Sequence, residues 1–142
     1  MRISTKAEQL MQERFGHDSL IALATCERNI PTVRTVDAYY DRNAFYVLTH
    51  ALSTKMRQIE QNPQIAISGD WFTASGVGES LGFFGSDANR EIAEKMREVF
   101  ASWIDNGHSD LKDENTIILK IRLTSGTLIS DGVRYDIDFG DL

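Results

Sequence analysis

Three β-rich runs joined by two short polar triplets set the fold class of this chain. The runs are Ser19–Thr25, Pro31–Ala38 and Ala44–Thr49, and the triplets between them are Glu27-Arg28-Asn29 and Asp41-Arg42-Asn43. A polar triplet between two β-rich runs is typical of a hairpin, which pairs neighbouring strands antiparallel. The first third of the chain therefore predicts an antiparallel meander and not a regular β-α-β alternation.

Three helices are predicted from capping residues and apolar spacing. The first begins with the capping box Thr5-Lys6-Ala7-Glu8, with Thr5 as the N-cap, and ends at Gly16. The second covers Ser53–Gln61 and ends at Asn62-Pro63, because proline disfavours helix in the residue before it. The third covers Asp87–Gly107, with Asp87 as the N-cap. Their apolar residues recur at helical spacing: Ala7, Leu10, Met11 and Phe15; Met56 and Ile59; Ile92, Met96, Val99, Phe100 and Trp103.

The other apolar segments predict further strands. They are Gln64–Phe72, Ala74–Glu79 followed by a glycine-rich loop, Thr116–Thr124 and Val133–Phe139, with a tight turn at Ser130-Asp131-Gly132. The predicted order is α-βββ-α-ββ-α-βββ. We expect a mainly β, α+β fold, in which an antiparallel, Greek-key-like barrel closes its own edges and the first helix covers a barrel opening. One domain is predicted over residues 1–142, because nothing repeats at a fixed period and no linker divides the chain.

The charge balance and the cysteine count limit the partners and the compartment. With 15 basic and 21 acidic residues the formal net charge is −6, which argues against nucleic acid or an anionic membrane as the main partner. The single cysteine, Cys26, has no internal disulfide partner and matches no metal-binding spacing with the histidines. No apolar run approaches the roughly 20 residues of a membrane span, and Met1–Lys6 lacks the apolar stretch of a signal peptide. We expect a cytoplasmic protein.

The segment most suggestive of chemistry is the junction between the run Ala44–Thr49 and the second helix. Ser53 or Thr54 at a helix start offers a hydroxyl beside free backbone N–H groups, and Lys55 and the helix dipole add the positive charge that a phosphate monoester requires. Arg34 is a neighbour through the hairpin and could donate two parallel hydrogen bonds to a phosphate or to a carbonyl-rich ring. Spacing alone favours a simpler account, in which Ser53 is an ordinary N-cap and both cations are solvated.

A resemblance to a known family favours the phosphate site over this simpler account. It rests on three motifs in chain order: Pro31-Thr32-Val33-Arg34-Thr35-Val36, then Phe45-Tyr46-Val47-Leu48-Thr49, then Ser53-Thr54-Lys55 followed by Asn62-Pro63. With these motifs the chain resembles the pyridoxamine 5′-phosphate oxidase-like family of FMN-binding split β-barrels. Within that family it is most similar to the short general-stress-protein branch. The resemblance covers about Ser19–Ile67, and it is weaker through Gly76 and over Thr116–Phe139.

The resemblance implies a cofactor, a set of binding residues and a homodimer. In this family FMN lies at a two-fold interface between two subunits. The Arg-x-Val strand lines the isoalloxazine and ribityl chain, and the end of the next strand and the helix start bind the ribityl and phosphate groups. The residues at these positions are Arg34, Thr35, Val36, Leu48, Thr49, Ser53, Thr54 and Lys55. From the second subunit, Trp71 or Thr73 is the candidate by position.

The resemblance also limits the predicted reaction. The segment Tyr135–Leu142 does not contain the extended Trp- and Arg-containing substrate segment of the authentic oxidases, so vitamin B6 oxidation is not expected. The expected function is a flavin-dependent oxidoreductase of unknown substrate, with FMN as the reactive group and NAD(P)H or a small molecule as electron donor or acceptor. No catalytic side chain and no metal site is assigned.

Two other functions stay open on the same fold. The first is a non-enzymatic flavin-binding or stress-related protein. The second exchanges FMN for the deazaflavin F420 or for haem, since relatives bind all three. Haem would call for an axial ligand such as His50 or His17, whereas the pattern Ser53–Lys55 favours a phosphorylated flavin.

Overall fold

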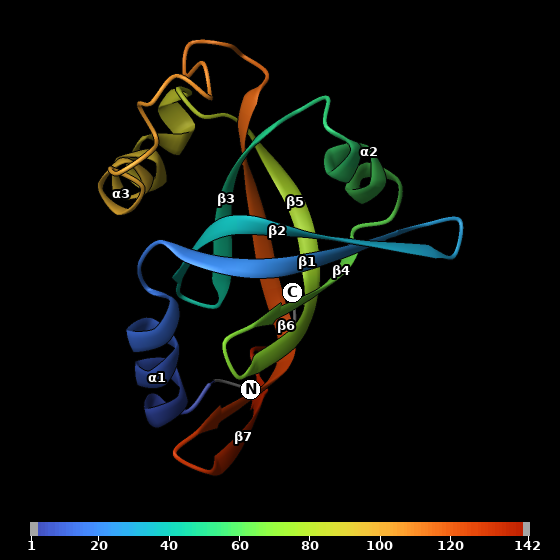
Figure 1. Cartoon of the computed structure of the whole chain (residues 1–142), viewed down its shortest axis with the longest axis vertical. Coiled ribbons are helices and arrows are strands. Elements are labelled where there is room, and N and C mark those ends of the chain that lie inside the picture. The colour runs from blue at the N-terminus through green and yellow to red at the C-terminus, as the bar shows by residue number, and fades with distance from the viewer. Residues whose placement is uncertain (1–2, 141–142) are drawn as a thin grey trace.

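An antiparallel β-barrel forms the centre of the computed structural model, which describes residues 3–140 (Figure 1). Three predictions include residues outside this range: the absence of a signal peptide at Met1–Lys6, the domain limits 1–142, and the lack of a substrate segment in Tyr135–Leu142. The strands are β1 (Ser19–Glu27), β2 (Ile30–Asp41), β3 (Ala44–His50), β4 (Gln64–Gly69), β5 (Phe72–Phe83), β6 (Thr116–Ser130) and β7 (Val133–Asp138). The α-helices are α1 (Thr5–Phe15), α2 (Thr54–Gln61) and α3 (Arg90–Val99).

Closure of the barrel follows from one pairing between distant strands. In the described part of the chain all strands join antiparallel in the order β3-β2-β1-β4-β5-β6-β7, and β3 also pairs with β6. This additional pairing closes β1 to β6 into a barrel, while β7 pairs with β6 and forms the hairpin at the bottom of Figure 1. The prediction of a mainly β, antiparallel barrel with flanking helices is confirmed.

Both predicted polar turns are two-residue hairpin loops. Arg28 and Asn29 have φ values of 53° and 64°, and Arg42 and Asn43 have φ values of 45° and 66°. Two consecutive left-handed residues are the geometry of a type I′ turn, whose twist matches that of the flanking strands. The tight turn predicted at Ser130-Asp131-Gly132 joins β6 to β7. Its two loop residues are Asp131 and Gly132, which both have positive φ, and Ser130 is the last residue of β6.

The start of α1 differs from the prediction by one residue. Its N-cap is Ser4 and not Thr5, because the Ser4 hydroxyl accepts the Ala7 N–H at 3.1 Å. Glu8 is therefore not part of a capping box, and it accepts a hydrogen bond from the Tyr40 hydroxyl at 2.8 Å. This bond ties α1 to β2. Serine and threonine satisfy the same free N–H groups, so the sequence alone did not distinguish the two adjacent positions.

The third helix is shorter than predicted. A 3-10 turn, η1 (Asp87–Asn89), precedes α3, so the N-cap of α3 is Asn89 and not Asp87. The Asn89 side chain donates to the carbonyl oxygens of Leu81 and Phe83 at 2.9 Å each, which anchors the helix start to β5. The helix ends at Val99 and not at Gly107.

Three strand predictions also need correction. The predicted strand Gln64–Phe72 breaks at the turn Asp70-Trp71, and its last residue already belongs to β5. β5 continues to Phe83 where a loop was predicted, because Ser80 and Phe83 still pair with Leu119 and Ile117 of β6. β6 is one continuous strand, so the described chain ends in two strands and not three.

Two apolar clusters hold the helices on the barrel. The larger fills the barrel interior and includes Met11 of α1 and Met56 and Ile59 of α2. The buried stripe of α1 therefore covers an opening of the barrel, as predicted. The smaller cluster lies outside, where α3 packs Met96 against Ile118 of β6. Within residues 3–140, no helix is long and apolar enough to cross a membrane.

Candidate anion site at the start of helix α2

The junction between β3 and α2 is held by local hydrogen bonds. Ser53 is the N-cap of α2, and its hydroxyl accepts the Met56 N–H at 3.4 Å. In the preceding loop, Nδ1 of His50 accepts the Leu52 N–H at 3.2 Å, and Nε2 of His50 lies 3.6 Å from Oδ2 of Asp113. The predicted N-cap is confirmed, and the junction presents the N-terminus of a helix, where anions are favoured.

Lys55 adds a positive charge beside this helix start. Its Nζ donates to the Thr49 hydroxyl at 2.6 Å, which draws the partly buried side chain toward β3. Burial lowers the pKa of Lys55, and the positive charge of Arg34 lowers this pKa further. Lys55 forms no ion pair with a carboxylate in residues 3–140. Lys55 is therefore not fully solvated, in contrast to the simpler account from residue spacing, in which Ser53 is only an N-cap and both cations are solvated.

Arg34 is the second cation, and the chain holds its guanidinium from two sides. Nη1 donates to the Leu23 carbonyl oxygen at 3.0 Å and to the Thr25 hydroxyl at 2.9 Å. Nη2 donates to Oε1 of Gln58 at 3.0 Å. Burial lowers the pKa of Arg34, and the described chain gives it no carboxylate partner either. The free donor fork that the sequence predicts is therefore partly occupied by β1 and α2.

Sequence reasoning missed the two polar side chains that hold Arg34. Thr25 is 2% exposed and Gln58 is 5% exposed, and the Thr25 hydroxyl donates to Oε1 of Gln58 at 2.5 Å. The sequence pattern does mark both positions as buried. Thr25 continues the buried alternation of β1, and Gln58 directly precedes Ile59 on the apolar face of α2. Polar side chains at such positions need partners inside the protein.

Together the two cations make this site positive, and residues 3–140 provide no carboxylate as an ion-pair partner for either of them. The guanidinium of Arg34 stays protonated at physiological pH, and an anion from outside the chain would stabilise the charged form of the partly buried Lys55. The hydroxyls of Ser53 and Thr54 and the helix N-terminus add neutral donors at the same place. A tetrahedral oxyanion such as phosphate matches this set of donors.

The other predicted residues do not join this site within one chain. Thr35 is exposed on β2, whereas Val36 is buried in the barrel interior and Leu48 packs in the cluster under α3. Trp71 lies at the β4–β5 turn with its side chain 69% exposed. Nη1 of Arg14 in α1 fixes this turn by donating to its carbonyl oxygens.

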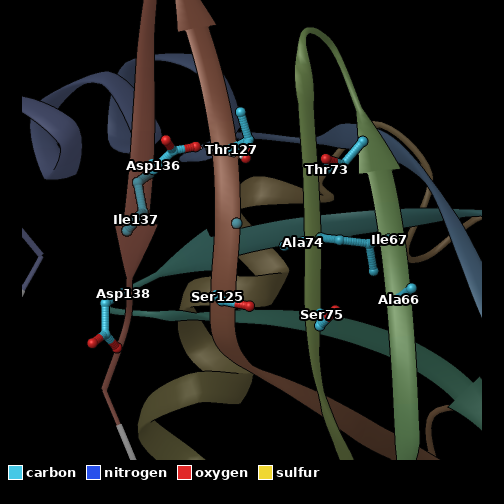
Figure 2. Close-up of a pocket in the computed structure, with 11 residues that line it drawn as sticks. Ala66, Ile67, Thr73, Ala74, Ser75, Ser125, Thr127, Asp136, Ile137 and Asp138 are labelled. Atoms are coloured by element: carbon cyan, nitrogen blue, oxygen red, sulfur yellow. Dashed lines mark hydrogen bonds between the residues drawn. The ribbon is translucent and has the colours of Figure 1, made fainter.

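An open groove of about 690 Å³ lies on another part of the surface, over β4, β5, β6 and β7 (Figure 2). Small side chains and two carboxylates of β7 line it: Ala66, Thr73, Ser75, Ser125, Thr127, Asp136 and Asp138. The register places these outward positions side by side on adjacent strands. Thr73, the predicted alternative to Trp71, therefore lies in the groove. No single segment of the sequence signals this surface, because four strands contribute to it.

Comparison with solved structures identifies the fold. General stress protein 26 from Bacillus anthracis str. Sterne matches with a TM-score of 0.68 at 16% identity, over 93% of this chain and 99% of that chain. A protein from Listeria innocua that is named for pyridoxamine 5′-phosphate oxidase matches with a TM-score of 0.64 at 12% identity, over 85% of this chain and 94% of that chain. This chain has the pyridoxamine 5′-phosphate oxidase-like split-barrel fold.

Other split barrels with this fold differ in what their names say they bind. HutZ, the haem storage protein from Vibrio cholerae, matches with a TM-score of 0.65 at 19% identity, over 99% of this chain and 98% of that chain. A FAD-binding protein from Mesorhizobium loti and an F420 reductase match with TM-scores of 0.63 and 0.64. Identities this low establish the fold alone. No protein-family model and no curated protein sequence matches the chain.

Proposed function

We propose that this split barrel binds FMN, with the phosphate at the start of α2 beside Lys55 and Arg34. The observation that carries the proposal is the pair of partly buried cations that lacks a carboxylate partner in the described chain. A phosphate monoester carries about two negative charges near neutral pH and would neutralise this pair. Thr49, Ser53 and Thr54 would supply hydroxyls to the phosphate and the ribityl chain.

The names of the structural neighbours support a flavin but leave F420 and haem as alternatives. The cation pair favours a ligand that ends in a phosphate, whereas the anionic groups of haem are carboxylates. The histidines also favour a flavin, because His50 has both ring nitrogens directed at protein groups, Leu52 and Asp113. His17 lies in the turn before β1, outside the junction at α2.

The proposal includes a homodimer with FMN between the subunits. Trp71 supports this arrangement, since its exposed side chain stands on a turn with a φ of 49° that Arg14 holds. An aromatic side chain that is exposed and rigidly presented is typical of an interface. Trp71 or Thr73 of the second subunit would then complete the cofactor site, and sedimentation tests for the dimer. A monomer that still binds FMN tightly would contradict this part of the proposal.

The proposed activity is that of a flavin-dependent oxidoreductase. Bound FMN would supply hydride or electron transfer, and the chain would orient the ring and hold the phosphate. NAD(P)H or a small molecule would serve as electron donor or acceptor. The single cysteine fits a protein of the reducing cytoplasm. A non-enzymatic flavin carrier is the second candidate, and anaerobic bleaching of the bound flavin by NADH or NADPH separates an enzyme from a carrier.

Titration of FMN by fluorescence quenching tests the proposed phosphate site. We expect saturation at one FMN per chain. Lys55→Ala should weaken binding about 10- to 100-fold, because it removes one charge-assisted hydrogen bond to the phosphate, worth about 1.5–3 kcal/mol. Lys112→Ala, at an exposed lysine before β6, is the matched control and should leave the affinity unchanged. Equal affinities for Lys55→Ala and the parent would contradict the site.

A further inference from the structure

Gln58 is the buried side chain that accepts from Arg34 at the proposed site. Its Oε1 accepts from Nη2 of Arg34 at 3.0 Å and from the Thr25 hydroxyl at 2.5 Å, and its Nε2 donates to the Thr32 hydroxyl at 3.4 Å. Thr25 already accepts from Nη1 of Arg34, so its own hydrogen must point at Gln58. The amide has a single orientation, because a flipped NH₂ group would face two donors.

The side chain of Gln58 accepts from Arg34 without carrying a negative charge, and this absence of charge indicates its role. A carboxylate facing a partly buried guanidinium forms a stronger, charge-assisted pair, and glutamate has almost the same shape as glutamine. The chain nevertheless places an amide at Gln58, and the carboxylate of α2, Glu60, is exposed. An amide orients Arg34 without cancelling its charge. Arg34 and Lys55 therefore keep two positive charges beside the helix start.

We propose that Gln58 is a positioning residue that makes the site selective for ligands with a dianionic phosphate, because it holds Arg34 through a neutral amide. This inference rests on the proposed FMN site and deepens it. Riboflavin has the ring and ribityl chain of FMN without the phosphate, so it gains little from the charge of Arg34. The ratio of the riboflavin Kd to the FMN Kd therefore measures the property that Gln58 preserves.

Three variants separate the charge of Gln58 from its packing. Gln58→Glu keeps the shape and adds a carboxylate, whereas Gln58→Met removes the acceptor and leaves the charge of Arg34 in place. Gln61→Glu makes the same chemical change at an exposed residue of the same helix and serves as the matched control. We expect Gln58→Glu to lower the preference for FMN over riboflavin by about tenfold or more, Gln58→Met to lower it less, and Gln61→Glu to leave it unchanged.

Thermal unfolding in inorganic phosphate supplies a readout without flavin. The Tm of the parent and of Gln61→Glu should rise with phosphate concentration, because the anion binds the folded state, and the Tm of Gln58→Glu should rise less. If Gln58→Glu does not fold, as judged by circular dichroism, Thr25→Asp brings a carboxylate to Arg34 from β1 and undergoes the same two measurements.

Two results would overturn the role of Gln58 and leave the FMN site standing. One is an FMN preference in Gln58→Glu equal to that of the parent. The other is an equal loss in Gln58→Glu and Gln58→Met, which would show that packing and not charge matters. A parent protein that binds FMN and riboflavin with the same Kd would instead overturn the proposed phosphate site itself.

Discussion

Two pairs of like charges lie at different places on the barrel, and the repulsion within each pair is relieved in a different way. The positive charge of Arg34 acts on Lys55 near the start of α2, and each of the two side chains is held by neutral partners. Asp18 and Asp37 meet near the segment that follows α3, where Nε1 of Trp103 donates to Oδ2 of Asp18 at 3.0 Å. Burial raises the pKa of Asp37 to about 6, and the hydrogen bond and negative charge of Asp18 contribute to this shift.

The two pairs differ in how they can lose charge. Because the pKa of Asp37 is raised to about 6, Asp37 can take up a proton in the folded protein as the pH falls and so relieve its repulsion with Asp18. A guanidinium does not release its proton at any accessible pH, so Arg34 keeps its charge beside Lys55. We therefore interpret the acidic pair as part of the packing under Trp103 and the basic pair as a binding site for an anion.

Arg34→Ala should have the largest effect on the basic pair. It leaves Thr25 and Gln58 buried without their charged donor, so the free energy of unfolding should fall by about 2–3 kcal/mol, and FMN binding should be lost. Urea denaturation measures the first effect. Arg57→Ala is the control, because Arg57 is an exposed residue of α2 whose pair with Glu27 contributes less than about 1 kcal/mol. Equal losses in the two variants would contradict a structural role for Arg34.

Asp37→Asn should have the next largest effect, and it acts on the acidic pair. The pKa of Asp37 in the folded state, about 6, is above its ordinary value of 3.8. Protonated Asp37 therefore stabilises the fold fully below about pH 4, and this contribution is lost as the pH rises through about 6. After allowance for solvent screening, we expect a loss of about 1 kcal/mol in the parent that is absent from Asp37→Asn.

Urea denaturation at a series of pH values measures this difference. Asp131→Asn, in the exposed β6–β7 turn, is the matched control and should keep the pH dependence of the parent. If Asp37→Asn kept the same slope as the parent, the pKa of Asp37 would not be raised in the folded protein.

Trp103→Phe should have the smallest effect. It removes the N–H donor to Asp18 and keeps an aromatic ring against Phe100, whose centroid lies 4.8 Å from that of Trp103. The free energy of unfolding should fall by about 1 kcal/mol in chemical denaturation. Trp71→Phe changes the same residue type at an exposed turn and should change stability by less than about 0.5 kcal/mol. A loss in Trp103→Phe no larger than the small change in Trp71→Phe would show that the indole N–H of Trp103 contributes nothing to stability.

The features that the sequence predicted are local, whereas the residues and the groove that it missed at the candidate site depend on closure of the barrel. The type I′ turns and the N-cap Ser53 depend on adjacent residues, so their positions were predictable. Thr25 and Gln58 are 33 residues apart and meet only when α2 packs on β1. The groove over β4 to β7 likewise depends on a register that no single segment specifies. For these parts of the molecule, long-range pairing was the missing information, whereas the starts of α1 and α3 were missed because nearby residues can serve equally well as N-caps.

The absorption spectrum of the purified protein, before and after reconstitution with FMN, is the most decisive single measurement. It distinguishes flavin, F420, haem and the absence of a chromophore in one experiment. We predict flavin bands that stay with the protein through gel filtration, at one FMN per chain. A haem or F420 spectrum in the isolated protein, or no retained chromophore after reconstitution, would contradict a phosphate site for FMN at Arg34 and Lys55.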